Sequence, residues 1–375
     1  MIIPNQKRLF SIPEGVTYMN CANMAPFLRT VEEAGVRAIE QRRQPWTIGA
    51  EQWFEPAEEL RMLFARIIGA EKDHVALIPS ASYGLSIAQR NMSLRPGQTI
   101  VILDQQYPSN VYAWQELALS SGAVIHTVKR ESGESWAEAI VRRIDEHTGL
   151  VAIPNCHWTD GSFIDLVQVG KKVKAVGAKL VIDASQSLGA YPLDVRKIQP
   201  DYVVTVGYKW LLGPYNLGYL YAAPACHEEG KPIEWSWMVK EGSDDFTRLV
   251  DYTERYKQGA RRFDAGEFAS FIHIPMARAA LEQLLDWGVD NIQESLSVLT
   301  GAIVERARKM GLEVAPGGSV GHMVGIRIQP ERIAGLQKKL VENKIYISFR
   351  GSNMRIAPHL YNDMEDVERL FGQMA

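Results

Sequence analysis

Short apolar runs recur along much of the chain, and they constrain its fold more than any other feature. Seven of these runs have the length and the β-branched or aromatic content of buried strands. They begin at Val75, Ile100, Ala123, Leu150, Leu180, Tyr202 and Leu217. Most of the segments between them, such as 109–121 and 166–177, have helical length and 3.6-residue apolar spacing. This alternation predicts an α/β domain with a seven-stranded, mostly parallel sheet.

The remaining chain predicts a second, smaller unit. Only a short segment joins the last two runs, so one of those strands is expected to run antiparallel. A helical region covers 272–310, and strand-like pieces beyond Gly311 flank a helix near 333–343. Because 375 residues exceed one ordinary core, we expect a large domain at 16–250. A small α+β domain would combine 1–15 with 270–375, and 251–269 would be a connecting loop near a subunit interface.

Charge and cysteine content exclude several classes of protein. The 41 basic and 44 acidic residues give a net charge of -3. This balance gives no excess of positive charge that would attract nucleic acid or an anionic membrane. No apolar run is long enough to span a bilayer. The three cysteines, at positions 21, 156 and 226, contain no CxxC pair, and the eight histidines show no ligand spacing. We therefore expect a cytoplasmic protein that binds neither nucleic acid nor membrane and has no metal site.

The pair Asp183 and Lys209 is the strongest chemical signal. Each follows a strand run, in LVIDASQS and VTVGYKWLLGP, and both could reach one edge of the sheet. A nucleophilic lysine needs a depressed pKa and a fixed position, which a pocket supplies. A carboxylate keeps the ring nitrogen of pyridoxal 5'-phosphate (PLP) protonated, so the pair suits that cofactor. The alternative is a helix-capping aspartate and a surface lysine.

The segment DASQSLGAYPLDVRKIQPDYVVTVGYKWLLGP resembles the lysine region of class V, fold-type I PLP enzymes. That group includes cysteine desulfurases, kynureninases, isopenicillin N epimerase-like proteins and several aminotransferases, and the resemblance extends over nearly the whole chain. It implies a fold-type I PLP-dependent transferase in which Lys209 holds PLP as a Schiff base and Asp183 pairs with the ring nitrogen. It also implies an amino acid substrate and a homodimer.

The resemblance assigns the phosphate to the turn IPSASYG, with Ser80, Ala81 and Ser82. Amide groups at a helix start attract phosphate on physical grounds too. The alternative for either serine is a simple helix N-cap. Tyr208, directly before the lysine, matches a position that often contacts the phosphate.

Further residues match positions around the cofactor ring. Tyr107, in DQQYPSN, matches the side chain that stacks on the ring, although it would also suit a helix staple. PNCHWTDG resembles the loop that touches the ring hydroxyl, with either His157 or Trp158 facing the cofactor. Gln186 matches a position that reaches the ring oxygen or the imine.

Two segments carry departures from the family pattern. NMRIAPHLYN resembles the R-x-S-x-x-x-Y-N signature, so Arg355 would grip the substrate carboxylate through its planar fork, with Ala357 in place of serine. An arginine paired with an acid of the small domain is the alternative. RRFDAGEFAS resembles R-F-E-x-G-T, a loop that crosses to the other subunit. Glu267 replaces its phosphate-binding threonine and would repel phosphate unless Arg261 or Arg262 neutralises it.

The sequence favours transamination, because the KWLLGP region looks most like class V aminotransferases. A C–S (Cβ) lyase and an epimerase of the isopenicillin N epimerase-like group remain alternatives, as does a catalytically idle binding protein. The stretch SFRGSNM before Arg355 has no cysteine and no room for the desulfurase loop, which argues against persulfide transfer. Kynureninase motifs differ around the lysine and the phosphate turn. The aromatic residues Trp46, Trp53, Phe54 and Tyr215 would shape an apolar substrate pocket or belong to the core.

Overall fold

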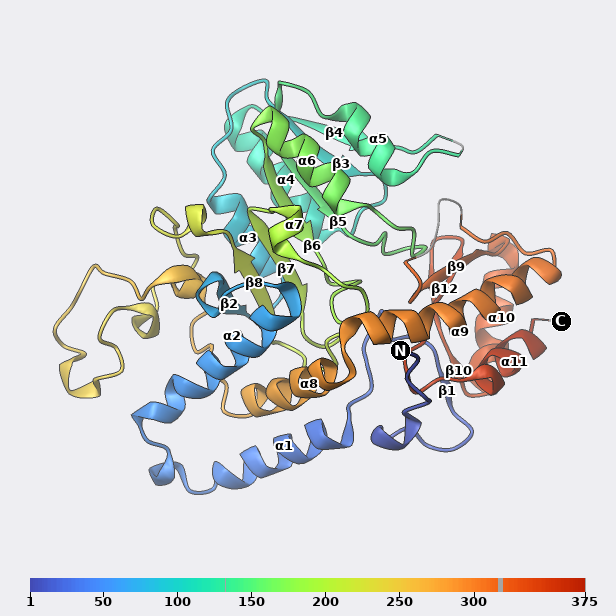
Figure 1. The fold of residues 1–375 in the computed structure, drawn as a ribbon, viewed down its shortest axis with the longest axis horizontal. Coiled ribbons are helices and arrows are strands. Elements are labelled where there is room, and N and C mark those ends of the chain that lie inside the picture. The colour runs from blue at the N-terminus through green and yellow to red at the C-terminus, as the bar shows by residue number, and fades with distance from the viewer. Residues whose placement is uncertain (132, 316–319, 375) are drawn as a thin grey trace.

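The computed structural model describes residues 1–131, 133–315 and 320–374. Within these residues the large sheet has seven strands in the order β2-β8-β7-β6-β5-β3-β4, which confirms the predicted fold class (Figure 1). The strands are β2 (Val75–Ile78), β3 (Thr99–Leu103), β4 (Val124–Val128), β5 (Thr148–Pro154), β6 (Lys179–Asp183), β7 (Tyr202–Val206) and β8 (Gly218–Ala222).

Strand β8 lies inside the sheet and is antiparallel to both of its neighbours, β2 and β7. The other pairs in the sheet are parallel. The prediction that one of the last two strands runs antiparallel is therefore confirmed. The physical reason is the short connection from Val206 to Gly218, which cannot make a helical crossover.

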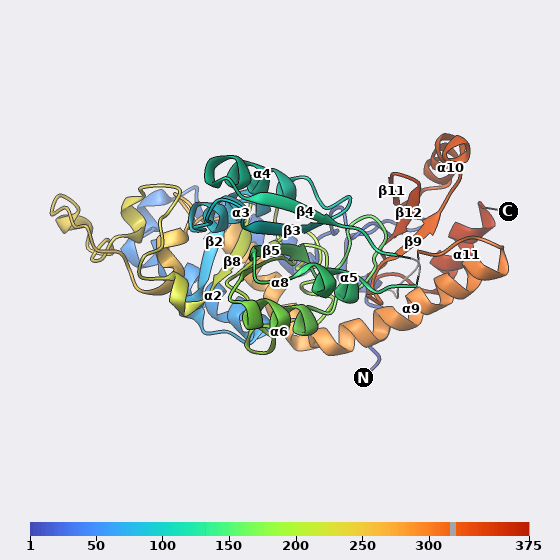
Figure 2. The same ribbon diagram turned by 90° about the horizontal axis from the view of Figure 1, so that it is seen from above.

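Helices cover both faces of the sheet, as the view from above shows (Figure 2). Alternate residues of a strand point to opposite faces, and in β5 Leu150 belongs to one core and Val151 to the other. Helices α3 and α4 pack on the face of Leu150, and α2, α5 and α6 pack on the face of Val151. The helices of this part are α1 (Arg29–Gln41), α2 (Glu55–Ile68), α3 (Ala81–Arg90), α4 (Ser109–Ser121), α5 (Trp136–Arg143), α6 (Leu166–Val176) and α7 (Val195–Ile198).

The C-terminal part forms a separate sheet with its own core. Its strands have the order β11-β12-β9, and both pairs are antiparallel. The core around Ile303, Leu340 and Val367 packs α9, α10 and α11 against these strands. The elements are α8 (His273–Trp287), α9 (Val289–Lys309), β9 (Val324–Arg327), α10 (Pro330–Glu342), β10 (Ile345–Tyr346), β11 (Ser348–Arg350), β12 (Asn353–Ile356) and α11 (Met364–Gly372).

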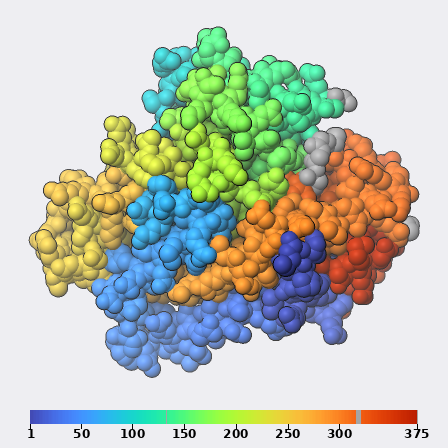
Figure 3. Space-filling model, viewed as in Figure 1, coloured from blue at the N-terminus to red at the C-terminus, as the bar shows by residue number. Residues whose placement is uncertain are grey.

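The N-terminal residues join the two parts. Strand β1 (Thr17–Tyr18) pairs in parallel with β10, and in the space-filling view the blue N-terminal residues pack against orange and red C-terminal ones (Figure 3). Helix α8 packs on α1 and α2. The domain boundaries at 16–250 and 270–375 stay a prediction. None of the described helices has the length and apolar character needed to cross a membrane.

Candidate active site

A small cavity lies where the carboxyl ends of several strands meet. Pro154, Asp183 and Val206 are the last residues of β5, β6 and β7. All three contribute to its wall. This is the sheet edge at which ligands of α/β proteins bind. The full wall consists of Ala81, Gln106, Tyr107, Asn110, Pro154, Cys156, Trp158, Asp183, Ser185, Gln186, Val206, Tyr208 and Lys209.

Lys209 reaches this cavity from the turn after β7, and its side chain is 8% exposed. Its ammonium lies 5.7 Å from the ring centroids of both Tyr107 and Tyr208. Burial, together with the charges of Arg355 and Arg350, lowers the pKa of Lys209 to about 8, and the charge of Asp183 opposes the shift. A lysine in this environment loses its proton much closer to neutral pH than a free lysine does, which favours a nucleophilic or basic amine.

Asp183 lies buried in the same cavity wall. Its Oδ1 accepts a hydrogen bond from the Ser185 amide at 3.0 Å, which fixes the carboxylate at the end of β6. The segment after it is a turn, so Asp183 caps no helix. The hydroxyl of Ser185 is buried without a hydrogen-bond partner among the described residues.

Gln186 also lines the cavity, but its amide already has protein partners. Its Nε2 donates to the carbonyl of Ala22 at 3.0 Å, and its Oε1 accepts from Trp210 Nε1 at 3.3 Å. The imidazole of His322 donates to the Gln186 carbonyl at 2.7 Å. The side chain is therefore tied to the N-terminal segment and to Trp210, and the backbone of Gln186 is tied to the residue His322, just before β9. These contacts could not be predicted from the sequence, since Ala22 and His322 are far from Gln186 along the chain.

The predicted phosphate turn lies at the start of α3, and Ala81 is part of the cavity wall. Ser80 caps the helix by accepting from the Tyr83 amide at 3.1 Å, and its hydroxyl lies 2.9 Å from that of Ser82. The capping role and the phosphate role are compatible, because the free amides of the first turn still point outward.

Tyr107 and Trp158 meet at the cavity, with ring centroids 5.6 Å apart and an edge-to-face angle of 80°. The indole of Trp158 donates to the Gln105 carbonyl at 2.7 Å. His157 lies elsewhere: its ring stacks on Trp136 at 5.3 Å and bonds to Thr159 and to the Asp104 carbonyl. Of the two neighbours in PNCHWTDG, Trp158 is the one in the cavity wall.

Arg355 lies on β12 with 1% of its surface exposed. Its Nε donates to Ser348 Oγ at 3.1 Å and its Nη1 to the Trp158 carbonyl at 2.8 Å. Its Nη2 is buried and has no partner among the described residues. Burial, together with the charge of Arg350, lowers the pKa of Arg355 to about 9. In the described chain no carboxylate pairs with it.

Arg350, at the end of β11, was not among the predicted site residues. Its guanidinium carbon lies 5.6 Å from the ring centroid of Trp158, and burial lowers its pKa. The signal in the sequence was FRGSNMR, where two arginines flank a Gly-Ser turn between strand-like pieces. The register of that hairpin was needed to bring them together.

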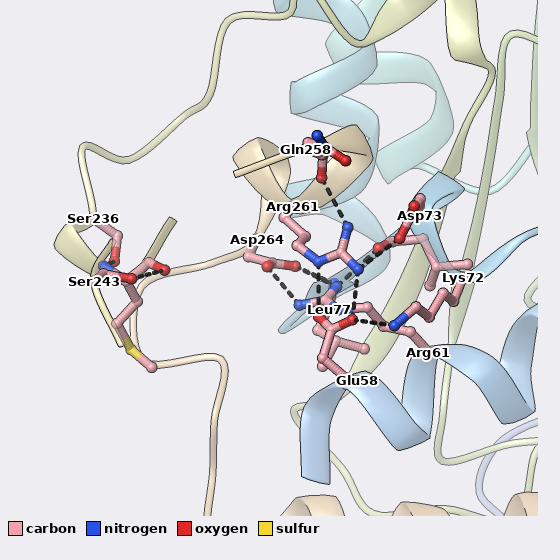
Figure 4. A network of polar contacts seen from close by, with 12 residues as sticks. Glu58, Arg61, Lys72, Asp73, Leu77, Ser236, Ser243, Gln258, Arg261 and Asp264 are labelled. Atoms are coloured by element: carbon pink, nitrogen blue, oxygen red, sulfur yellow. Dashed lines mark hydrogen bonds and ion pairs between the residues drawn. The ribbon is translucent and has the colours of Figure 1, made fainter. Parts of the chain in front are cut away.

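The loop that resembles R-F-E-x-G-T lies in an ion-pair network (Figure 4). Asp264 accepts from Arg61 Nη1 and Nη2 at 2.8 and 2.6 Å. Arg261 pairs with Glu58 and Asp73, and Arg262 donates to backbone carbonyls. Within the described chain no ion pair joins either arginine to Glu267. Glu267 has a φ of 57° and lines a separate cavity with Arg42 and Phe271.

The four aromatic residues proposed as pocket walls are outside the wall of the Lys209 cavity, although the ring of Tyr215 lies 4.7 Å from that of Tyr208, which is part of that wall. Trp53 and Phe54 pack against Trp237 and Phe246, while Trp46 and Tyr215 are exposed. None of the four is in the wall of the Lys209 cavity as described.

The residues present suit PLP. A buried lysine with a lowered pKa, a fixed carboxylate and a helix start surround one cavity. Two polar atoms in its wall, Ser185 Oγ and Asn110 Nδ2, are buried without a partner in the described residues. Buried polar atoms are normally satisfied, so these two mark where a polar ligand would bond.

Comparison with known proteins gives the same assignment. Residues 49–370 match the family described as aminotransferase class-V. A relative named uncharacterized aminotransferase YcbU, from Bacillus subtilis (strain 168), is 30% identical over 86% of this chain and 84% of its own. Isopenicillin N epimerase of Amycolatopsis lactamdurans is 23% identical over 98% of this chain and 96% of its own.

A solved structure shows the same fold. It is a mutant of C-DES, a cystine C–S lyase, with glycine covalently linked to its PLP cofactor. The TM-score is 0.88 at 16% identity, and the match covers 98% of each chain. The resemblance found in the lysine region is thereby confirmed at the level of family and fold. This chain belongs to the class V aminotransferase family of fold-type I enzymes, whose cofactor is pyridoxal 5'-phosphate.

Proposed function

We propose that this protein is an aminotransferase that acts on an α-amino acid, with Lys209 as its cofactor-bonding and proton-transferring residue. The observation that carries the proposal is the cavity in which Lys209, Asp183 and the start of α3 converge beside a buried arginine with a free N–H edge. Relatives named aminotransferase support the reaction class.

When bound, PLP supplies an electron-withdrawing ring that stabilises negative charge at the substrate Cα. Asp183 would hold the ring nitrogen in its protonated form. Ser80 and the amides of the first turn of α3 would bind the phosphate. We further propose that Tyr107 and Trp158, rather than His157, contact the ring, since those two side chains line the cavity.

Lys209 has two tasks in this proposal. Its amine would hold the cofactor at rest, and the free amine would accept at Nζ the proton that leaves the substrate Cα. Because burial lowers its pKa to about 8, the amine is a competent base near neutral pH. Arg355 would orient the substrate by donating from Nη2 to the α-carboxylate, which would satisfy that buried group.

The hairpin before Arg355 disfavours transfer of sulfur to a protein thiol. Strands β11 and β12 are joined by Gly351 and Ser352, with Gly351 at a φ of 57°, so no loop carries a nucleophile here. Cys156 lines the cavity, but burial raises its pKa well above the usual value and keeps it a neutral thiol. A direct C–S lyase or an epimerase needs no such thiol, and these are the alternatives that the assay must separate.

The test uses the purified full-length protein loaded with PLP. Borohydride should fix the cofactor covalently in the wild type and not in Lys209→Ala, as measured by the mass of the denatured protein. Each common amino acid is then added, and keto acid, ammonia, sulfide and inversion at Cα are assayed. One equivalent of keto acid with pyridoxamine 5'-phosphate supports the aminotransferase. Ammonia or sulfide release supports the lyase, inversion supports the epimerase, and absence of cofactor binding overturns the proposal.

A further inference from the structure

Two arginines lie on one face of the β11–β12 hairpin. Ser348 pairs with Arg355 and Arg350 pairs with Asn353 across the two strands. Directly opposed residues of an antiparallel pair share a face, as do residues two apart on one strand. Arg350 and Arg355 are therefore diagonal neighbours on the same face.

Both guanidinium groups converge on Trp158, which forms part of the cavity wall. Arg355 donates to the Trp158 carbonyl at 2.8 Å, and the Arg350 guanidinium carbon lies 5.6 Å from the Trp158 ring centroid. Arg350 also donates to the Phe349 carbonyl at 2.8 Å and to Asn23 Oδ1 at 3.4 Å. These contacts hold it at the side of the cavity where Arg355 would bind the α-carboxylate.

The positive charge at this place lacks a protein counter-charge. Neither arginine pairs with a carboxylate among the described residues, and each disfavours the charged form of Lys209. Their partners are carbonyl oxygens, a hydroxyl and an amide. Arg355 is buried and Arg350 is partly buried, and a charge that is removed from water is normally paired, because desolvation without a partner is costly. One substrate carboxylate would compensate one of the two guanidinium groups.

We propose that Arg350 binds a second anionic group, on the side chain of the substrate, so that the preferred substrate is an acidic amino acid with a side-chain carboxylate or sulfonate. This inference rests on the proposed function, since it extends the substrate site of the same cavity. The planar fork of arginine suits both groups through paired, charge-assisted hydrogen bonds.

The experiment measures binding of unreactive acids to the full-length protein, with and without PLP. Succinate and glutarate are compared with butyrate and valerate, which have the same carbon counts and one carboxylate each. Calorimetry gives the dissociation constants. We expect the wild type to bind each diacid about tenfold or more tightly than its monoacid partner, as a charge-assisted contact implies. Arg350→Gln should remove this preference and change monoacid binding little. Arg350→Lys should retain part of it.

A matched control lies in the same small sheet. Arg327, on β9, pairs with Asn353 in the register and is exposed, and Arg327→Gln should leave the preference intact. The midpoint of the Lys209 titration gives a second readout, because loss of a nearby positive charge in Arg350→Gln should raise it.

Equal affinity for diacids and monoacids in the wild type, or a preference that survives in Arg350→Gln, would overturn the inference. If Arg350→Gln fails to fold, the wild-type comparison and Arg350→Lys still decide. Binding of PLP is tested separately, by borohydride reduction and the mass of the denatured protein. Failure to bind PLP therefore counts against the proposed function, whereas normal loading without diacid preference counts against Arg350 alone.

Discussion

A single side chain, Lys209, sets the pH range in which this site can work. Its surroundings lower its pKa from 10.5 to about 8, mainly by burial. At pH 7 about one lysine in ten is then neutral, compared with fewer than one in a thousand for an unshifted amine. The fraction able to attack the cofactor therefore rises about tenfold per pH unit below 8 and levels off above it.

We expect the rate of covalent PLP capture by the cofactor-free protein to follow this curve, with a midpoint near pH 8. Stopped-flow absorbance across pH 6–10 measures it. In Arg355→Gln the midpoint should lie higher, since Arg355 disfavours protonation of Lys209. A wild-type midpoint near 10 would contradict the lowered pKa.

At this scale the sequence identified residue types better than their partners. Asp183 and Lys209 were predicted at one edge of the sheet, and both line the same cavity. The choice between His157 and Trp158 was open because two adjacent residues in a loop point in different directions. Arg350 was missed because its closeness to Arg355 depends on the register of a two-residue hairpin turn.

At the scale of elements, the loop after η8 (Gly259–Phe263) is held to α2 and β2 by buried charge. Arg61 donates hydrogen bonds from both Nη1 and Nη2 to the carboxylate of Asp264. That carboxylate also accepts a hydrogen bond from the Leu77 amide at 2.7 Å. Both side chains are 1% exposed. Removal of one partner would leave the other charge buried and uncompensated.

Asp264→Asn should therefore lower the free energy of unfolding by about 3–5 kcal/mol, measured as a fall in midpoint during chemical or thermal unfolding. Glu305→Gln is the matched control. Glu305 pairs with Lys309 on the exposed surface at 2.5 Å, where water screens the charges, and its replacement should change the midpoint far less. Similar losses of unfolding free energy in the two variants would show that burial of the Arg61–Asp264 pair does not increase its contribution to stability.

The strands of the large sheet could be predicted from the sequence, because fully buried parallel strands form continuous apolar runs such as LVAIP. The order of the strands in the sheet could not be predicted, because an apolar run does not indicate which strand it will pair with. The short N-terminal strand β1 was also not predicted. Two residues leave no periodicity to recognise, and its partner β10 lies at the other end of the chain.

At the scale of the whole molecule, exposed apolar side chains gather on one segment. Trp235, Val250 and Tyr252 are 72%, 76% and 95% exposed. They lie between β8 and the loop that resembles the family's crossing segment. Exposed large apolar side chains on one segment are typical of an interface, and we predict that this segment contributes to the homodimer expected from the resemblance.

We predict that the protein sediments as a dimer of 42.1 kDa chains at micromolar concentration. Val250→Asp should shift the equilibrium towards the monomer, because it places a charge in an apolar contact. Leu119→Asp, which changes an equally exposed apolar residue on α4, should leave the dimer unchanged. A wild-type protein that sediments as a monomer over the whole range would refute the prediction.

The interior position of β8 has a consequence for synthesis on the ribosome. Strand β2 ends at Ile78, and its only ladder in the described sheet is with β8, which begins at Gly218. At ordinary elongation rates the ribosome needs on the order of ten seconds to make the chain between them. During that time β2, with the turn of Ser80 and Ala81 behind it, has an unpaired edge. A nascent chain at this stage is a natural client for chaperones, and a message cut before codon 218 would yield a chain in which β2 lacks its strand partner.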